Sequence, residues 1–273
     1  MAVYLRKLWA KKPRQWGPKK RVAYAVRRYC EDVAGCSAPL IYLPLWEKAG
    51  NYPHDYGSIG AQLSPANGTP TQVWKGNYLD CSTDVRRFEA DDYGGKIPTT
   101  GGTFITTLKR VSNSNTNQSI GYIRNASTNS RVGWRIYGSG AYISLGDYTA
   151  ASLTAKVIFG ETHSYIFNWN PDQFTWERGA EYSYTGSDSN YSDSADFDKL
   201  GILDYAGSTA YNVKSAHVYQ WLYFGEELSE DQRRLFSDNP YAMIQRPDAT
   251  FYSFPDPTPP SDIVIFRRRI EGY

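Results

Sequence analysis

The three histidines, His54, His163 and His217, are the first candidates for catalysis or metal binding. They are dispersed along the chain, without the HxH or HExxH spacing that would hold a metal ion. A Ser–His–Asp triad stays open, because triads assemble across a fold, but the G-x-S-x-G turn of many serine hydrolases is absent. His217 alternates with Tyr219 and Trp221, and this pattern favours a packed position on the aromatic face of a strand.

The cysteines and the acidic residues offer few metal ligands. Cys30 and Cys36 are six positions apart and Cys81 is isolated, so neither a zinc site nor a redox pair is expected. One loop carries the hard oxygen ligands that calcium prefers, at Asp188, Asn190, Asp193, Asp196 and Asp198. An EF-hand is excluded there, because the required glycine and glutamate are replaced by Asp193 and Lys199. We expect no cofactor. Two interpretations of this loop stay open: it binds a calcium ion, or it is a solvated loop without a metal.

Aromatic side chains provide candidates for sugar binding. Tyr, Trp and Phe make up 15% of the chain. Trp169, Trp176 and Tyr182, with Asn170 and Asp172 nearby, could stack on a sugar ring and bind its hydroxyl groups. A sandwich core also needs such rings, and alternation alone does not say which face of a strand is wet. The glycan-binding role of these three aromatic residues is therefore a hypothesis.

Both ends of the sequence are basic. Residues 1–28 carry ten basic residues and no acid, which leaves 20 basic against 28 acidic residues for the remainder of the chain. Such ends bind acidic partners, and the interleaved tryptophans are not typical of free tails. No zinc finger, RRM or helix-turn-helix pattern is present, so sequence-specific nucleic-acid binding is not expected. The predicted partner-anchoring residues are Arg6, Lys7, Trp9, Lys11, Lys12, Arg14, Trp16, Arg267, Arg268 and Arg269.

Alternating patterns predict an all-β body that positions these residues. Residues 131–137, 163–170 and 214–224 alternate with period two, and residues 103–111 and 119–125 are also β-like. In 214–224, the predicted faces are Ala216, Val218, Leu222 and Phe224 against His217, Tyr219, Trp221 and Tyr223. Because this strand is apolar or aromatic on both sides, we expect it to be central or covered.

Two helices and a stiff tail complete the expected organisation. Residues 19–33 can form a helix, and Ser229 with Gln232 forms a capping-box pattern for a helix from Ser229 to Asp238. Five prolines between residues 247 and 262 predict an extended tail. The predicted divisions are a basic arm (1–37), a sandwich (38–245) and a proline-rich tail with a basic cluster (246–273). No run of 18 apolar residues and no signal-peptide core are found, so no membrane partner is expected.

Several segments resemble laminin-G-like, concanavalin-A-like jelly-roll domains. Residues 40–50 (LIYLPLWEKAG) and 55–60 (DYGSIG) resemble the opening strand and turn, and residues 73–79 (VWKGNYL) resemble its Trp-Gly strand. Residues 218–221 and 225–241 (VYQW, GEELSEDQRRLFSDNPY) resemble the closing strand and helix. The sequence departs from that closing pattern at 225–227 and at 231–232. The resemblance implies a two-sheet antiparallel jelly-roll sandwich with one short C-terminal helix and extended basic termini.

The resemblance also suggests a function. Two features resemble sequences of tailed-bacteriophage proteins. One is the aromatic residue, Tyr241, that follows Asn-Pro after the helix, and the other is the segment at residues 6–13 (RKLWAKKP). This implies a non-enzymatic virion structural protein, a capsid decoration or head fibre bound to the major capsid protein or other virion proteins, as a monomer or homo-oligomer. The alternative is a carbohydrate-binding adhesin of a phage tail that binds cell-surface glycans.

Related sandwiches that hydrolyse β-glucans use an E-x-D-x-x-E strand, in which two carboxylates act as nucleophile and acid. The nearest segment here, residues 89–94 (EADDYG), ends in Gly94 and is expected to lie in a glycine-rich turn. Because the second carboxylate is missing, glucanase activity is not expected.

Overall fold

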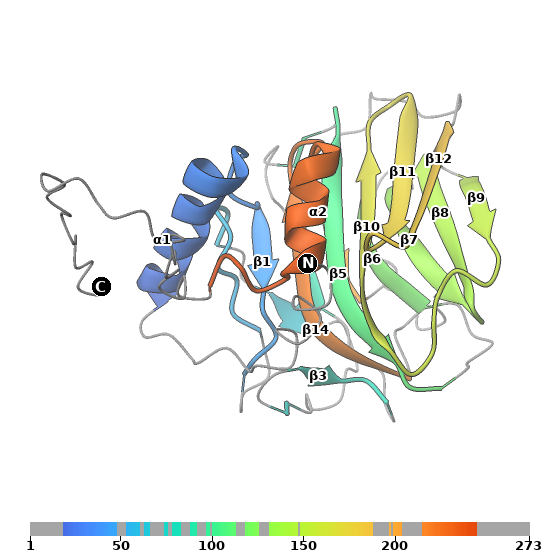
Figure 1. Cartoon of the computed structure of the whole chain (residues 1–273), viewed down its shortest axis with the longest axis horizontal. Coiled ribbons are helices and arrows are strands. Elements are labelled where there is room, and N and C mark those ends of the chain that lie inside the picture. The colour runs from blue at the N-terminus through green and yellow to red at the C-terminus, as the bar shows by residue number, and fades with distance from the viewer. Residues whose placement is uncertain are drawn as a thin grey trace, which may run out of the picture.

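The protein folds as two antiparallel β-sheets packed face to face, with helices on one outer face (Figure 1). The computed structural model describes residues 19–47, 53–60, 63–65, 74–75, 78–82, 88–91, 97–98, 100–112, 118–125, 131–146, 148–187, 197, 199–203 and 215–244. The predicted all-β sandwich is confirmed. Among these residues no helix is both long and apolar enough to cross a membrane.

The first sheet, sheet A, has the order β1-β14-β5-β10-β11-β12, and β3 also pairs with β14. Its strands are β1 (Ile41–Leu43), β3 (Leu79–Asp80), β5 (Gly102–Arg110), β10 (Thr162–Trp169), β11 (Gln173–Arg178), β12 (Tyr182–Ser187) and β14 (Ala216–Phe224).

Sheet B has the order β2-β4-β13-β6-β7-β8-β9. Its strands are β2 (Ser64–Pro65), β4 (Phe88–Asp91), β6 (Gln118–Arg124), β7 (Arg131–Tyr137), β8 (Gly140–Gly146), β9 (Tyr148–Leu153) and β13 (Lys199–Ile202). Every pairing between these strands is antiparallel, and many neighbours in the sheets are distant in sequence.

The core between the sheets is aromatic and follows the predicted alternation. The inward residues of β7 and β10 are buried, as their period of two predicts: Val132, Trp134, Ile136, Tyr165, Phe167 and Trp169. Trp134 and Tyr165, from opposite sheets, approach to 5.6 Å between ring centroids. Contacts of this kind add to the apolar area that closing the sandwich removes from water.

The predicted faces of β14 are wrong in one respect. Its pairing with β5 shifts between Val218 and Gln220, so an extra residue is accommodated by a β-bulge. After the bulge the faces exchange, because each inserted residue turns the following side chains over. Ala216, Val218, Trp221 and Tyr223 therefore point into the core, whereas Leu222 and Phe224 lie on the outer face.

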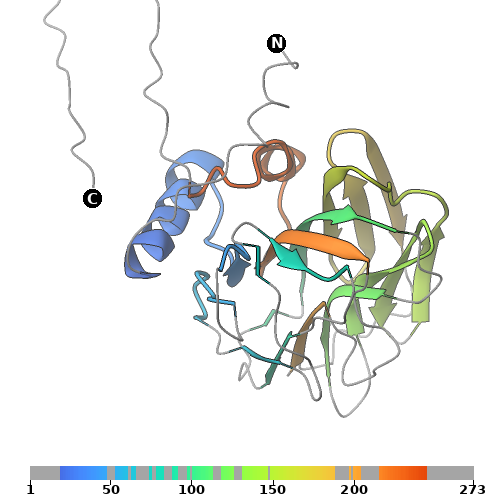
Figure 2. The same ribbon diagram turned by 90° about the horizontal axis from the view of Figure 1, so that it is seen from below.

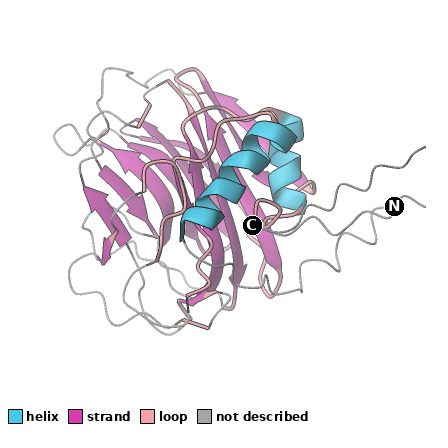
Figure 3. Cartoon of the chain, turned by 90° about the vertical axis from the view of Figure 1, so that its left-hand side faces the viewer, coloured by secondary structure: helices cyan, strands magenta, loops and turns pink. Residues whose placement is uncertain are grey.

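That outer face is covered by both helices, so the prediction of a covered strand is confirmed. In Figure 3, α1 (Lys19–Tyr29) and α2 (Glu230–Asp238) lie in front of the strands. Figure 2 shows them side by side over one side of the sandwich. A second apolar cluster fills the space below them and includes Val22, Val26, Leu222, Phe224 and Phe236. Residues 19–34, which were predicted to belong to the arm, thus pack on the body, while the division at residue 37 stays a prediction.

A π-helical turn, η2 (Cys30–Ala34), follows α1 and ends at Gly35, whose φ of 65° suits glycine. The turn brings Cys30 and Cys36 together at the edge of the second cluster. Six-residue spacing alone does not predict this approach, because it depends on where the helix ends.

The turn at residues 55–60 supports the resemblance to the jelly-roll opening. Asp55 Oδ1 accepts the N–H groups of Tyr42 (2.9 Å) and Gly57 (2.7 Å), which fastens the turn to β1. A Cβ at Gly57 would lie 2.3 Å from the carbonyl oxygen of Leu40, so only glycine fits. Of the expected strand at 73–79 the structure describes residues 74–75 and 78–79, and there Trp74 pairs with Leu79, where β3 begins, in an isolated antiparallel bridge.

Residues 89–91 also differ from expectation. They belong to strand β4, which pairs with β2 and β13, and not to a turn. The reason is long-range pairing, which stabilises this short segment despite the glycines that follow it.

Candidate functional site

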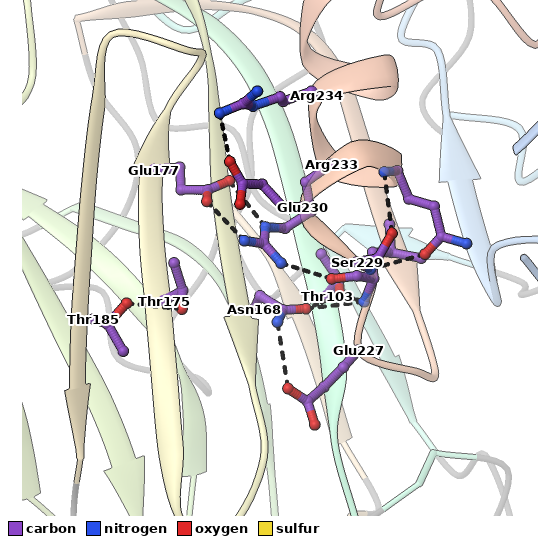
Figure 4. A network of polar contacts seen from close by, with 12 residues as sticks. Thr103, Asn168, Thr175, Glu177, Thr185, Glu227, Ser229, Glu230, Arg233 and Arg234 are labelled. Carbon is purple, nitrogen blue, oxygen red and sulfur yellow. Dashed lines mark hydrogen bonds and ion pairs between the residues drawn. The ribbon is translucent and has the colours of Figure 1, made fainter.

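A polar cleft lies on the part of the outer face of sheet A that the helices leave uncovered. Its volume is about 400 Å³, and it is open to one side. Strands β10 and β11 form its floor, and the segment that leads into α2 forms its wall (Figure 4). The lining residues are Asn168, Gln173, Phe174, Thr175, Glu227, Leu228, Ser229 and Arg233.

The alternation of β10 and β11 explains why the cleft is polar. Their large aromatic side chains turn inward, so the outward positions are left to Asn168, Thr175 and Glu177. On the neighbouring strand β12, Thr185 Oγ1 lies 3.3 Å from Thr175 Oγ1. The uncovered sheet thus presents amide, hydroxyl and carboxylate groups over an aromatic core.

Asn168 and Thr103 hold the wall of the cleft. The backbone N–H of Leu228 donates to both Asn168 Oδ1 (3.1 Å) and Thr103 Oγ1 (3.0 Å). Thr103 Oγ1 lies 2.5 Å from Asn168 Oδ1 and 2.9 Å from the carbonyl oxygen of Glu226, and its single proton is donated to one of these two acceptors. Because Thr103 and Asn168 are buried, these bonds are shielded from water and keep the wall in place.

Glu227 is the exposed carboxylate of the cleft. Asn170 Nδ2 donates to its Oε1 at 2.9 Å, and Asn168 Nδ2 lies 3.4 Å from its Oε2. Asn170 is itself oriented, because its Oδ1 accepts the N–H groups of Asp172 (2.9 Å) and Gln173 (2.8 Å). The carboxylate is therefore pre-positioned by two amides and keeps acceptor capacity toward solvent.

Arg233 and Glu177 close the other end of the cleft. The guanidinium donates through Nε and Nη2 to the two carboxylate oxygens, at 3.0 and 2.8 Å, and through Nη1 to the carbonyl oxygen of Leu228 at 2.6 Å. The two side chains are 11% and 10% exposed. Such a bidentate pair fixes α2 to β11 and neutralises both charges locally.

Helix α2 begins with the predicted capping box. Ser229 Oγ accepts the N–H of Gln232 (3.3 Å), and Gln232 Oε1 accepts the N–H of Ser229 (2.8 Å). The remaining Nε2 group of Gln232 donates to the carbonyl oxygens of Ala34 (3.1 Å) and Gly35 (3.0 Å). One side chain therefore joins the start of α2 to the end of the first helical segment.

Replacing Ser229 with alanine should lower the free energy of unfolding by about 1 kcal/mol, because one N–H group at the helix start loses its acceptor. Ser229→Asp, which keeps an acceptor, should be close to the wild type. Urea unfolding of the three proteins measures the effect. Equal stability of Ser229→Ala and the wild type would show that the cap is dispensable.

The structure corrects the prediction of two sugar-stacking tryptophans. Trp169 and Trp176 have no exposed surface and pack in the core between the sheets. Tyr182 is only partly buried, with Lys156 Nζ 4.1 Å above its ring and Trp176 6.1 Å away. Alternation predicts that these aromatic residues share a face but not which face is buried, and the structure assigns them to the sandwich core.

Of the residues predicted to bind sugar, the polar pair Asn170 and Asp172 lies close to the cleft. Asn170 positions Glu227, as described above. Sequence reasoning missed Asn168, Gln173, Glu227 and Arg233, since the cleft depends on how α2 sits on the sheet. The one available signal was the outward position of Asn168 opposite Trp169.

The three histidines lie apart from the cleft lining. His217 stacks on Tyr78 with ring centroids 4.4 Å apart, which agrees with its predicted place on an aromatic face. His54 and Glu47 are neighbours, with Nδ1 3.6 Å from Oε1. His163 lies on β10 with its side chain 11% exposed, near Glu161 and Glu181.

Burial of His163 predicts a pH effect on stability. Burial lowers its pKa below the ordinary 6.5; Glu181 and Glu161 oppose this shift and Arg178 reinforces it. As the pH falls through 6.5, the unfolded chain takes up a proton that the folded protein does not, so the folded protein loses stability below this value. His163→Gln should lose less stability than the wild type between about pH 7.5 and 5.5 in urea titrations. Parallel curves for the two proteins would contradict this prediction.

Other predicted sites fall outside the described residues. These are the acidic loop at 188–196 and 198 and the anchoring residues at 6–16 and 267–269. Within the described residues, no group of three or more histidine, cysteine or acidic side chains could hold a metal ion. Calcium binding and anchoring therefore stay predictions.

Comparison with known proteins supports the fold. No family model and no curated protein matches the sequence. Among solved structures, Trypanosoma rangeli sialidase in complex with the inhibitor DANA is similar with a TM-score of 0.63, 9% identity and coverage of 88% of this chain and 38% of that one. The botulinum neurotoxin serotype D binding domain is similar with a TM-score of 0.54, 12% identity and coverage of 72% and 50%.

The same sialidase in complex with sialic acid gives a TM-score of 0.59 at 10% identity. The chain therefore spans about 38% of the sialidase and half of the toxin binding domain. At these identities the similarity establishes the all-β sandwich fold alone. The similar structures include both an enzyme and a binding domain.

Proposed function

We propose that this protein is a non-enzymatic carbohydrate-binding module, and that the polar cleft beside α2 holds the sugar. The observation that carries the proposal is the cleft itself. Fixed amide, hydroxyl and carboxylate groups converge there on an uncovered sheet, with Asn168 and Glu227 held by their own hydrogen bonds. Polar groups fixed in advance bind a polyhydroxylated ligand without a large ordering cost. The similarity in fold to a sialidase and to a toxin binding domain also supports this proposal.

The charges of the cleft favour a neutral sugar. Arg233, the cation among the described lining residues, is engaged with Glu177, and Glu227 is exposed. The local balance is therefore negative, and this disfavours carboxylated or sulfated glycans. The proposed ligand class is a neutral oligosaccharide that donates hydroxyl protons to Glu227 and accepts from the Gln173 amide.

The same charges argue against hydrolysis. Glycosidases of the common types use two carboxylates, one on each side of the scissile bond. In the described cleft Glu177 is held bidentately by Arg233, which leaves Glu227 as the carboxylate without a cation partner among the lining residues. We expect no release of reducing sugar from any glycan that binds.

Binding to an array of neutral and acidic glycans tests this function. Wild-type protein should select neutral glycans, and Gln173→Ala and Glu227→Ala should each weaken binding about tenfold, the effect of losing one good hydrogen bond. Tyr137→Ala is the matched control, because Tyr137 is 42% exposed on the other sheet. The proposal is wrong if no glycan binds, or if both cleft variants bind as well as the wild type.

A second proposal concerns location. We propose that the body is displayed on a bacteriophage particle, as a capsid decoration or head fibre bound to the major capsid protein. It is supported by the ten basic residues in 1–28 without an acid and by Trp9 and Trp16 among them. Exposed ion pairs contribute less than 1 kcal/mol each, so the two tryptophans should contribute most of the affinity for the capsid. The basic residues should determine how strongly that affinity depends on salt.

Deletion of residues 1–18 tests the anchoring, because it leaves α1 whole. The deletion should abolish salt-sensitive binding to undecorated shells, and glycan binding should be unchanged. Unchanged shell binding by the deletion variant would refute anchoring and leave the carbohydrate proposal untouched.

A further inference from the structure

The turn after α1 places two thiols at its two ends. The N–H groups of Gly35 and Cys36 both donate to the carbonyl oxygen of Cys30, the latter at 3.0 Å. With Gly35 in the left-handed conformation, this is the helix-ending arrangement in which the last buried side chain meets the residue after the glycine. Here both of those residues are cysteines, and both side chains belong to the second apolar cluster, Cys30 within it and Cys36 packed against it. The backbone hydrogen bond from Cys36 to Cys30 brings their Cα atoms into the range that a disulfide can span.

The two thiols have different surroundings. Cys30 is fully buried, with its sulfur 3.7 Å from Met243 Sδ, whereas Cys36 is partly exposed. The neighbouring Cys36 thiol and burial both raise the pKa of Cys30, whereas the neighbouring Cys30 thiol lowers the pKa of Cys36. Cys36 is therefore the thiol that an oxidant reaches first and the better source of thiolate.

The same turn holds the wall of the cleft. Gln232 Nε2 donates to the carbonyl oxygens of Ala34 and Gly35, and the N–H of Ser37 donates to Glu226 Oε1 at 2.6 Å. Glu226 is followed by the wall residues Glu227–Ser229. A change in the turn between Cys30 and Cys36 is thus transmitted through three hydrogen bonds to the segment that closes the cleft.

We propose that Cys30 and Cys36 are a redox-active pair whose disulfide fixes this turn and, through it, the wall of the cleft. The oxidant is a low-molecular-weight disulfide. The Cys36 thiolate attacks one of its sulfurs, forms a mixed disulfide and releases one thiolate. Cys30 then loses its proton and attacks the Cys36 sulfur, so that the protein disulfide forms and a second small thiol leaves. Two electrons and two protons pass from the protein to the oxidant.

Treatment of the full chain with oxidised glutathione tests the proposal. The expected product is a protein lighter by about 2 Da with no retained glutathione, and digestion should give a cross-linked peptide that contains Cys30 and Cys36. Cys81, which is buried in the sandwich core, should stay a thiol. Melting temperature should rise by about 5 °C on oxidation, because the unfolded chain is restricted.

Two variants make the outcome decisive. Cys36→Ser should show neither the mass change nor the rise in melting temperature, and Cys81→Ser should show both. Hydrogen exchange of the Leu228 and Ser229 amides should slow on oxidation of the wild type only. Retained glutathione without a cross-link would overturn the pair, and unchanged exchange at the wall would overturn the link to the cleft. None of these readouts needs a bound glycan; only the effect of oxidation on affinity rests on the proposed function.

Discussion

Trp221→Ala is expected to lower the free energy of unfolding by about 3–5 kcal/mol, the range for removing a buried tryptophan. Trp221 has no exposed surface and spans the two sheets. Its Nε1 donates to the carbonyl oxygen of Ile120 on β6 at 3.0 Å, and its ring meets Phe104 edge-on with centroids 5.7 Å apart. The facing Gly121 leaves room for the indole, since a Cβ there would lie 2.8 Å from Nε1. Removing the ring leaves a cavity, and the carbonyl oxygen of Ile120 keeps only its hydrogen bond from the N–H of Leu203 at 3.1 Å.

Trp221→Phe separates the two contributions. It keeps most of the apolar volume but loses the hydrogen bond, while the carbonyl oxygen of Ile120 keeps the N–H of Leu203, so about 0.5–1.5 kcal/mol should be lost. Urea unfolding, followed by circular dichroism, measures all three proteins. Tyr137→Ala, on the exposed end of β7, is the control and should change stability by less than about 0.5 kcal/mol. A loss below about 1 kcal/mol for Trp221→Ala would show that the sheets are held together elsewhere.

Glu177→Ala is expected to have the next largest effect, a loss of about 2–3 kcal/mol, because it leaves a largely buried guanidinium without its carboxylate. Arg233 keeps only its bond to the carbonyl oxygen of Leu228. The wall of the cleft should then loosen, and glycan affinity should fall together with stability.

The double variant Glu177→Leu/Arg233→Leu tests the cause. If the loss comes from the charge that is left behind, the double variant should recover most of the stability, since an apolar pair of similar volume often replaces a buried ion pair at little cost. Urea unfolding of the single and double variants gives the coupling energy. Additive losses would contradict the explanation and assign the effect to packing alone.

The fold could be predicted from the sequence because its strands bury one face each. In β7 and β10 the apolar side chains recur at every second position, and the capping box at Ser229 marks where α2 begins. These are local signals, and the structure follows them. The bulge in β14 could not be predicted, because it arises from the pairing with β5 and not from any local residue preference.

The cleft was harder to predict than the fold. Aromatic residues suggest sugar binding, but Trp169 and Trp176 are core residues, because the interior of a sandwich competes for the same side chains. The cleft needs α2 to dock on β10 and β11, a tertiary contact made through Glu177 and Arg233. Likewise, Cys30 and Cys36 meet only because the first helical segment ends at Gly35.

Hydrogen exchange with and without a neutral oligosaccharide selected on the array tests the central claim most directly. If the sugar occupies the cleft, the amides of Leu228, Ser229 and Gln173 should be protected on binding, because they lie in its wall and floor. The same measurement on Glu227→Ala should show little protection at equal sugar concentration. Protection confined to sheet B, with the wall and β11 unchanged, would contradict the account and place the sugar elsewhere on the molecule.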